Sequence, residues 1–229
     1  MQKNGLERFS TLIKLYVLHK IIDLRKQISE WKSEGLSVGL VPTMGGLHNG
    51  HGSLIKLASK KCDRVIVSIF INPTQFGDDE DFETYPQTQK SDITLISEAG
   101  GDAAFIPNVS EMYPRGFSTK VSVIGLTNML CGASRPGHFD GVTQVVAKLL
   151  NQVSADMAFF GEKDWQQLTI IKRLVRDLDI PTKIVNVATV RDEFGLALSS
   201  RNSYLKSSQL EIARKLSSVL QMTAYNIAS

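Results

Sequence analysis

Apolar residues recur along the chain in two different patterns, and the pattern changes from one segment to the next. Residues 19–35 carry apolar side chains at intervals of three and four between Ile21 and Trp31, which predicts a helix that ends at Gly35. The preceding run, residues 12–22, is interrupted by lysines and a histidine. We therefore expect this run to form an amphipathic helix rather than the apolar region of a secretory signal.

The next segments predict a strand–helix–strand unit. Residues 37–42 (SVGLVP) and 64–72 (RVIVSIFIN) are short runs of mainly apolar residues, and an uninterrupted apolar run is typical of a strand buried on both faces. Residues 49–61 between them have a helical pattern. The three segments together have the length expected of a βαβ unit.

Helical and extended patterns continue to alternate toward the C-terminus. Helical patterns cover residues 87–100, 141–153, 164–179 and 209–225, and extended patterns cover residues 102–107, 157–161 and 182–187. Such alternation predicts an α/β fold, with a parallel sheet covered by helices on both faces. Ligands in such folds bind beyond the carboxyl ends of the strands, so the loops that follow the strands are the places for a site.

Four of these strand-exit loops are rich in side chains that can bind or react. They are residues 42–51 (PTMGGLHNGH), 72–76 (NPTQF), 161–167 (GEKDWQQ) and 197–202 (ALSSRN). Because parallel strands end at the same edge of a sheet, the four loops are expected to converge there.

The first loop brings His48 and His51 to the first turn of a predicted helix. Backbone N–H groups and the positive end of the helix dipole favour an anion at that position, and the glycines let the backbone approach it closely. Phosphate is the favoured ligand, with a zinc site and a purely structural turn as alternatives. A zinc site needs further ligands, and neither His19 nor His138 has ligand-like neighbours in the sequence.

The other three loops each allow a binding role and a structural role. Lys163 and Asp164 can bind a phosphate and a ribose hydroxyl, or they can be a surface lysine and a helix cap. Residues 199–201 offer two hydroxyls and a guanidinium to an oxyanion, or form a solvated turn. Asn72 and Gln75 suit a hydroxyl or carboxylate, or cap the backbone of a turn.

Two further features are less specific. Arg135 lies in CGASRPGHF, a segment whose glycines and proline predict mobility, and it could close over an anion, although loop arginines are commonly only solvated. Trp31 and Trp165 lie at helical spacing, and we expect both in the core.

Composition and charge narrow the class of protein. The 229 residues are 42% hydrophobic and 21% charged, and the net charge of +3 gives little support for nucleic-acid binding but suits an anionic small molecule. The two cysteines form no CxxC pair, and the apolar runs are shorter than the roughly 20 residues of a membrane helix. We expect a cytoplasmic protein with no nucleic-acid or membrane partner.

The motifs taken together resemble one enzyme family. VPTMGGLHNGH, INPTQF, YP at residues 85–86, MYP at residues 112–114, LCGASRPGHFDGV, FFGEKDWQQL and LALSSRN occur in the order typical of pantothenate synthetases. The match extends from about residue 24 to residue 205. The HxGH motif alone indicates only the wider nucleotidyltransferase superfamily, with its Rossmann-like fold.

The resemblance implies a reaction. The family condenses pantoate with β-alanine, using ATP and Mg²⁺, and releases AMP and diphosphate. The pantoate carboxylate attacks the α-phosphate to give pantoyl adenylate, and the β-alanine amine then displaces AMP. The family also implies a homodimer.

The resemblance also implies site residues. His51, His48 and Lys163 are expected to be catalytic, with His51 as the acid that assists the leaving group. Gln75 and Gln167 are expected to hold pantoate, and Asn72 to support the phosphate or adenylate side; the metal ligands are unknown. The expected nucleotide contacts are Met44, Gly45, Gly46, Leu47, His48, Asn49, Gly50, His51, Gly161, Glu162, Lys163, Asp164, Val190, Leu198, Ser199, Ser200 and Arg201.

This sequence departs from the family pattern in places. Leu198 stands where methionine is usual, Gln87 stands where arginine is common, and an acidic pair is reduced to Ser91–Asp92, which bears on the metal contacts. The family continues for several dozen residues beyond the helix at 209–225. We therefore expect a Rossmann-like domain at residues 1–187 and a small, shortened C-terminal domain at 188–229. The alternatives are an adenylyltransferase for another substrate and a shortened relative that binds nucleotide without turnover.

Overall fold

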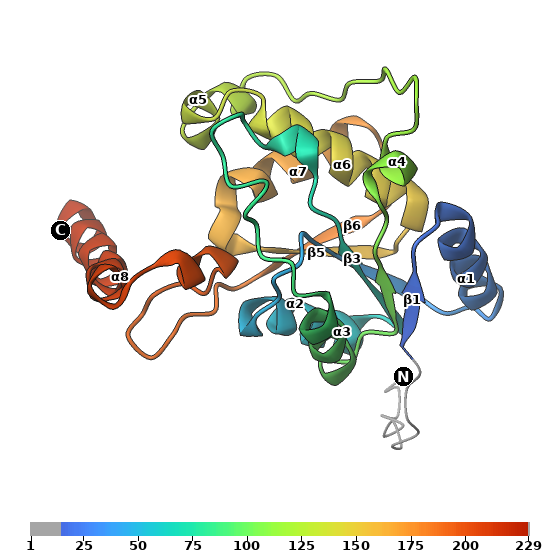
Figure 1. The fold of residues 1–229 in the computed structure, drawn as a ribbon, viewed down its shortest axis with the longest axis horizontal. Helices are drawn as coiled ribbons and strands as arrows, with labels where there is room; N and C mark the ends of the chain where they lie inside the picture. The colour runs from blue at the N-terminus through green and yellow to red at the C-terminus, as the bar shows by residue number, and fades with distance from the viewer. Residues whose placement is uncertain (1–14, 229) are drawn as a thin grey trace.

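The computed structural model describes residues 15–228. They form a parallel sheet with helices on both faces (Figure 1). The strands are β1 (Tyr16–Leu18), β2 (Val38–Thr43), β3 (Arg64–Ile69), β4 (Ala103–Phe105), β5 (Met157–Gly161) and β6 (Lys183–Val187). Their order across the sheet is β1-β4-β3-β2-β5-β6, and every pairing is parallel. The predicted α/β class and Rossmann-like sheet are confirmed.

The helices are arranged in two layers. The α-helices are α1 (Ile21–Ser33), α2 (Asn49–Lys61), α3 (Gln89–Glu98), α4 (Val109–Met112), α5 (Cys131–Ser134), α6 (His138–Val153), α7 (Trp165–Asp177) and α8 (Ser207–Ala228). The 3₁₀ turns are η1 (Pro73–Gln75), η2 (Leu126–Asn128), η3 (Glu162–Asp164) and η4 (Ser200–Tyr204). Side chains of α1, α6 and α7 form one apolar core with the sheet, and those of α2 and α3 form the other on the opposite face.

The two central strands, β2 and β3, are mainly apolar, which suits strands that are buried on both faces. β2 and β3 pair over six residues each, and nearly all of their side chains are buried because helices cover both faces. Strand order reverses between β2 and β5, since the chain adds β3 and β4 on one side and β6 on the other. The exit loops of β2 and β5 therefore flank a switch point, where such folds bind ligands.

Two expectations about the N-terminal part and the tryptophans are corrected. Residues 16–18, inside the run expected to be helical, form the edge strand β1, and the helix begins at Ile21. A three-residue edge strand is too short to show a period of its own. Trp31 is buried as expected, but Trp165 is 61% exposed on α7.

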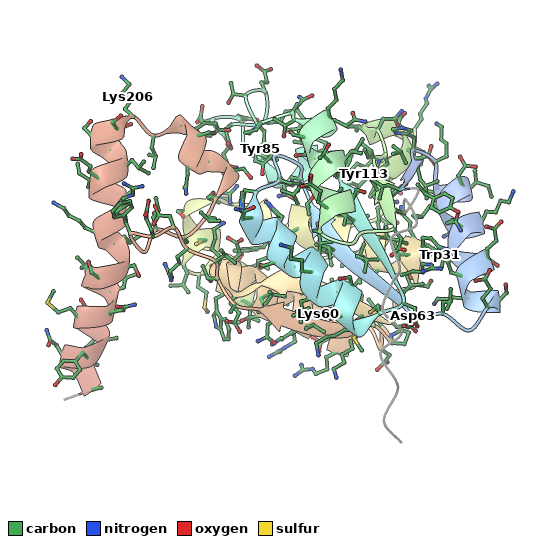
Figure 2. All side chains as sticks on the ribbon, turned by 90° about the horizontal axis from the view of Figure 1, so that it is seen from below. Trp31, Lys60, Asp63, Tyr85, Tyr113 and Lys206 are labelled. Carbon is green, nitrogen blue, oxygen red and sulfur yellow. The ribbon has the colours of Figure 1, made fainter. Side chains whose placement is uncertain are left out.

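The C-terminal segment is built differently from the sheet. None of residues 188–228 is buried, and α8 stands clear of the body, with Lys206 just before its first residue (Figures 1 and 2). A second domain core is thus not observed within the described residues. None of the helices described is long and apolar enough to cross a membrane.

Candidate active site

A cavity of about 240 Å³ opens at the switch point of the sheet. It is bounded by the exit loops of β2 and β5, by η1, by one face of α6 and by residues that follow β6. The four predicted loops therefore do converge on one edge. The predicted residues that line the cavity are Met44, His48, Gly50, His51, Gln75, Gly161, Lys163, Asp164, Gln167, Val190, Leu198, Ser199, Ser200 and Arg201.

The two histidines cap the N-terminus of α2 reciprocally. The backbone N–H of Gly50 donates to Nδ1 of His48 over 3.1 Å, and the backbone N–H of His48 donates to Nδ1 of His51 over 3.3 Å. The ring centroids lie 4.2 Å apart. Since each Nδ1 is an acceptor, each neutral ring carries its proton on Nε2 and has that N–H available as a donor. The imidazoles thus extend the hydrogen-bonding reach of the helix terminus.

Gly50 makes this arrangement possible. A Cβ at that position would lie 2.7 Å from Cε1 of His48, so a larger residue would displace the ring from the helix terminus. The glycine between the two histidines is therefore required for packing as well as for access to an anion.

Burial keeps both imidazoles neutral. Desolvation lowers the pKa of His51 to about 3, with smaller effects from His48 and Lys163. The pKa of His48 is also lowered, by burial first and then by Lys163. With no anion beside it, His51 is thus a neutral hydrogen-bond donor at neutral pH, and acting as an acid would require a nearby negative charge to raise its pKa.

The glycine loop is held from behind by Asp92, whose side chain is buried. Its carboxylate accepts the backbone N–H groups of Gly46 and Leu47 at 3.1 and 2.8 Å, and the Thr88 hydroxyl at 2.9 Å. We expected the loop backbone to approach an anion, but these two N–H groups are already occupied by a carboxylate. Gly45, Gly46, Leu47 and the exposed Asn49 shape the loop without lining the cavity.

Residues 199–201, hereafter the clamp, follow β6 in the sequence and line the cavity together with the glycine loop. The Ser200 hydroxyl donates to the Gly46 carbonyl over 2.9 Å, and Ser199 accepts the Arg201 N–H. The Arg201 guanidinium makes two bonds to Asp81, at 2.8 and 2.7 Å, and lies 5.4 Å from the ring centre of Tyr85. The clamp is therefore held by contacts to Gly46 and Asp81 and is not simply a solvated turn.

The β5 exit loop contributes a cation to the same cavity. Nζ of Lys163 lies 3.5 Å from the Asp164 carboxylate. Asp164 occupies the N-cap position of α7 but its side chain makes no capping hydrogen bond there, so helix capping does not account for it. Glu162, predicted to touch the nucleotide, instead accepts from Asn186 over 2.6 Å and does not line the cavity.

Gln75 and Asn72 have different roles. Gln75 lines the cavity, and its Nε2 lies 3.1 Å from the Met44 sulfur. Asn72 is fully buried and donates to Gln75 over 3.1 Å and to the Gly141 carbonyl over 3.0 Å, while it accepts from Thr74 and Tyr113. Asn72 therefore caps η1 and positions Gln75. Of the two roles considered for Asn72, ligand binding and backbone capping, its contacts correspond to capping.

Several lining residues were not predicted from the sequence. Val142, Val145, Val146 and Leu149 on α6 form an apolar wall. Their helical spacing is the same as that of core residues, so pattern alone does not identify them. Tyr85, which hydrogen-bonds Ser200, also lines the cavity.

Arg135, for which a solvated position was the alternative, and His138, which was considered only as a zinc ligand, both belong to the cavity wall. His138 bonds the Gln75 carbonyl through Nδ1 at 2.8 Å and Arg135 through Nε2 at 3.0 Å. Since a carbonyl only accepts, His138 carries its proton on Nδ1, the opposite tautomer from His48 and His51.

Comparison with known proteins gives a consistent result. The family model described as Pantoate-beta-alanine ligase matches residues 16–228. A pantothenate synthetase of Dinoroseobacter shibae is 53% identical over 213 residues, which cover 93% of this chain and 76% of that relative. One from Paramagnetospirillum magneticum is 53% identical and covers 87% and 70%.

Solved structures agree with the sequence relatives. The pantothenate synthetase of Thermus thermophilus superposes with a TM-score of 0.87 at 46% identity, covering 90% of this chain and 74% of that one. A pantoate-beta-alanine ligase from Francisella tularensis, complexed with Beta-gamma ATP and Beta-alanine, superposes with a TM-score of 0.85 at 42% identity, covering 90% and 79%. The chain therefore belongs to the pantoate–β-alanine ligase family.

Proposed function

We propose that this chain performs the ATP-dependent condensation of pantoate with β-alanine in two steps within the one cavity. In the first, a pantoate carboxylate oxygen bonds to the α-phosphorus of ATP and the bond to diphosphate breaks. In the second, the β-alanine nitrogen bonds to the activated carbonyl carbon, the bond to AMP breaks, and the nitrogen loses a proton. The product is pantothenate.

One observation carries this proposal: the cavity combines phosphate-binding groups with a wall suited to pantoate. His48, His51 and Lys163 form one cluster, in which Lys163 acts electrostatically on both rings. Gln75 and the apolar face of α6 line the same cavity. Pantoate carries a dimethyl group, hydroxyls and a carboxylate, so it needs both an apolar wall and amides.

The roles proposed for the residues around the nucleotide follow from the hydrogen-bond donors and positive charges that line the cavity. The Nε2–H groups of His48 and His51 donate to phosphate oxygens, Lys163 supplies a point charge, and the clamp adds hydroxyls and a guanidinium. In-line attack at phosphorus needs positioning and charge stabilisation more than a protein nucleophile. His51 is the donor at the departing diphosphate, whose negative charge raises the pKa of the ring as the bond breaks.

The remaining contacts are assigned by position. Gln75 and Gln167 bind pantoate, Asp164 binds the ribose, and Val190 packs by the adenine. The complex named for the Francisella tularensis relative supports binding of ATP and β-alanine by this chain as well.

Mg²⁺ is proposed to enter with ATP. Within residues 15–228, no group of three or more His, Cys, Asp or Glu could hold a metal ion, and Asp92 is occupied by backbone N–H groups. The donor set therefore fits a Mg²⁺ held mainly by phosphates and water, as is common for this ion. When bound, it neutralises phosphate charge.

The other family expectations are kept as proposals. These are a homodimer, a cytoplasmic location, and a division of the chain at residue 187 into the Rossmann-like domain and a C-terminal unit that carries the clamp. The absence of buried side chains at 188–228 supports treating that segment separately from the sheet.

The test uses pantoate labelled with ¹⁸O in its carboxylate. Attack at the α-phosphorus leaves one labelled oxygen in AMP after β-alanine displaces it, and AMP formation then depends on both substrates. Unlabelled AMP, or ADP as the nucleotide product, contradicts the adenylate route. Adenylation with no amide product indicates an adenylyltransferase, and ATP binding without turnover indicates a binding protein.

A further inference from the structure

The segment at residues 77–84, here called the acidic segment, contacts two arginines of the cavity wall, Arg135 and Arg201. Its sequence is GDDEDFET, and it joins η1 to the Tyr85 region. Two of its carboxylates form side-on pairs with two arginines that line the cavity. Neither carboxylate lines the cavity itself.

The first pair anchors the clamp. Asp81 accepts Nε and Nη2 of Arg201 at 2.8 and 2.7 Å, and it also accepts the Tyr204 hydroxyl at 3.1 Å. This leaves Nη1 of Arg201 outside the pair. The guanidinium is therefore fixed by one edge while the other edge stays available to an anion.

The second pair reaches the pantoate side through a chain of hydrogen bonds. Glu80 accepts Nε of Arg135 at 2.6 Å and also its Nη2. Nη1 of Arg135 bonds Nε2 of His138 at 3.0 Å, and Nδ1 of His138 bonds the Gln75 carbonyl at 2.8 Å. Glu80 thus acts on the backbone of the glutamine that is proposed to bind pantoate.

The geometry points to Glu80 and Asp81 as positioning residues, each for a different substrate. Asp81 orients Arg201 toward the phosphates of ATP, and Glu80 orients Gln75 toward pantoate through Arg135 and His138. This inference rests on the proposed substrate sites. The opposite arrangement, in which the carboxylates compete with the substrates for the arginines, predicts the opposite change in KM.

The side-on geometry favours positioning. A competing carboxylate would have to occupy the edge that the substrate uses, whereas both pairs here use the Nε edge and both arginines still line the cavity. Tyr85, buried beneath Arg201 at 5.4 Å, further restricts the guanidinium plane.

The experiment measures KM for each substrate in Asp81→Asn and Glu80→Gln. We expect Asp81→Asn to raise KM for ATP by roughly tenfold and to leave KM for pantoate unchanged, because small displacements of a positioning group have large effects. For the same reason, we expect Glu80→Gln to raise KM for pantoate by roughly tenfold and to leave KM for ATP unchanged. Asp79→Asn is the matched control. It removes the same charge from the same segment, and Asp79 is exposed and forms no salt bridge within the described residues.

A double-mutant cycle tests whether each acid acts through its arginine. Adding Asp81→Asn to Arg201→Ala should cause no further change in KM for ATP, and adding Glu80→Gln to Arg135→Ala should cause none for pantoate. Calorimetric binding of a non-hydrolysable ATP analogue to Asp81→Asn gives a readout independent of turnover, and we expect affinity to fall by a similar factor.

Four results would overturn the inference: lowered KM in either variant, both KM values rising together in one variant, an equal shift in Asp79→Asn, or additive effects in the cycle. The first indicates competition, the second a merely structural loop, the third a general field effect, and the fourth a route that bypasses the arginines. Failure of the proposed function is separate, because it would appear as wild-type protein that forms no pantoate-dependent AMP.

Discussion

The two sides of the cavity are held in contrasting ways. On the β2 side, the glycine loop lies between a buried strand and the buried Asp92 carboxylate, and the histidines are fixed by reciprocal caps. On the clamp side, Arg201 is 43% exposed, its ion pair is partly exposed, and none of residues 188–228 is buried.

The difference indicates how the site divides its tasks. Donors that stabilise developing charge need to be in place before the reaction, so that no reorganisation is needed in the transition state. Groups that close over a substrate must be able to move, and such elements come from the less stable parts of a structure. The buried contacts of the β2 side suit the first of these proposed tasks, and the exposure of the clamp suits the second.

The largest effect is expected from removing a donor on the fixed side. His51→Ala should lower kcat by about 10²–10³, the usual loss for one preorganised donor. His51→Gln keeps an amide N–H near the position of Nε2, so it should retain more activity. Steady-state kinetics measure the difference, and equal losses in the two variants would show that the donor is not the important feature of His51.

Two aspartates allow the two sides to be compared by stability. Asp92→Ala removes a buried carboxylate and leaves the partly buried N–H groups of Gly46 and Leu47 without their acceptor, so we expect it to lower the free energy of unfolding by about 3 kcal/mol. Asp81→Ala removes a partly exposed pair and should cost less than about 1 kcal/mol. Urea denaturation gives both values, and similar losses would contradict a fixed side and a movable side.

The pH dependence of stability examines the fixed side further. The folded pKa of His51, lowered to about 3 by burial, is below the unfolded value near 6.5, so the folded chain binds fewer protons between these values. The contribution of the neutral ring is complete above about pH 6.5 and is lost as pH falls toward 3. The slope from this ring is at most about 1.4 kcal/mol per pH unit, reduced by its residual exposure.

The control is His51→Gln, which cannot titrate in that window. Its unfolding free energy, measured by urea at about pH 7.5 and about pH 5.5, should fall less than that of the wild type. An equal fall of the unfolding free energy in both proteins would mean that the pKa of His51 is not lowered by folding.

The smallest effect concerns the contact between the two sides. Ser200→Ala removes the hydrogen bond to the Gly46 carbonyl and should raise KM for ATP by a factor of about 2–10, the equivalent of one ordinary hydrogen bond. Ser203→Ala is a nearby control, because its hydroxyl bonds only locally to the Ser200 carbonyl. A thermal melt should show little change in either variant.

Much of the fold could be predicted because its signals are local. The buried runs of β2 and β3, the helical spacing of α1 and the repeated alternation are properties of short segments, and parallel topology brings the exit loops together. β1 was missed because three edge residues have no measurable period. The exposure of Trp165 was missed because helical spacing does not say which face of α7 is covered.

The site was predicted less completely, for a physical reason. His48, Lys163, Gln75 and the clamp lie in recognisable motifs, and the structure brings them to the cavity. The residues that hold them are distant in sequence: Asp92 is 45 residues from Leu47, and Asp81 is 120 residues from Arg201. Such pairings depend on the completed tertiary structure, so no segment of sequence reveals them.

The bond between Ser200 and Gly46 joins residues 154 positions apart, and this separation has a consequence for how the chain acquires function. Contacts of such long range form late, since the entropy of closing the intervening loop is lost before they contribute. On the ribosome, β2 emerges long before the clamp, so a growing chain has its glycine loop and histidines before the residues that contact this loop from the C-terminal segment. A nucleotide bound between the two sides, as proposed, therefore stabilises the chain in which β6 has joined the sheet and the clamp contacts the glycine loop, and by mass action it favours that state over partly folded ones.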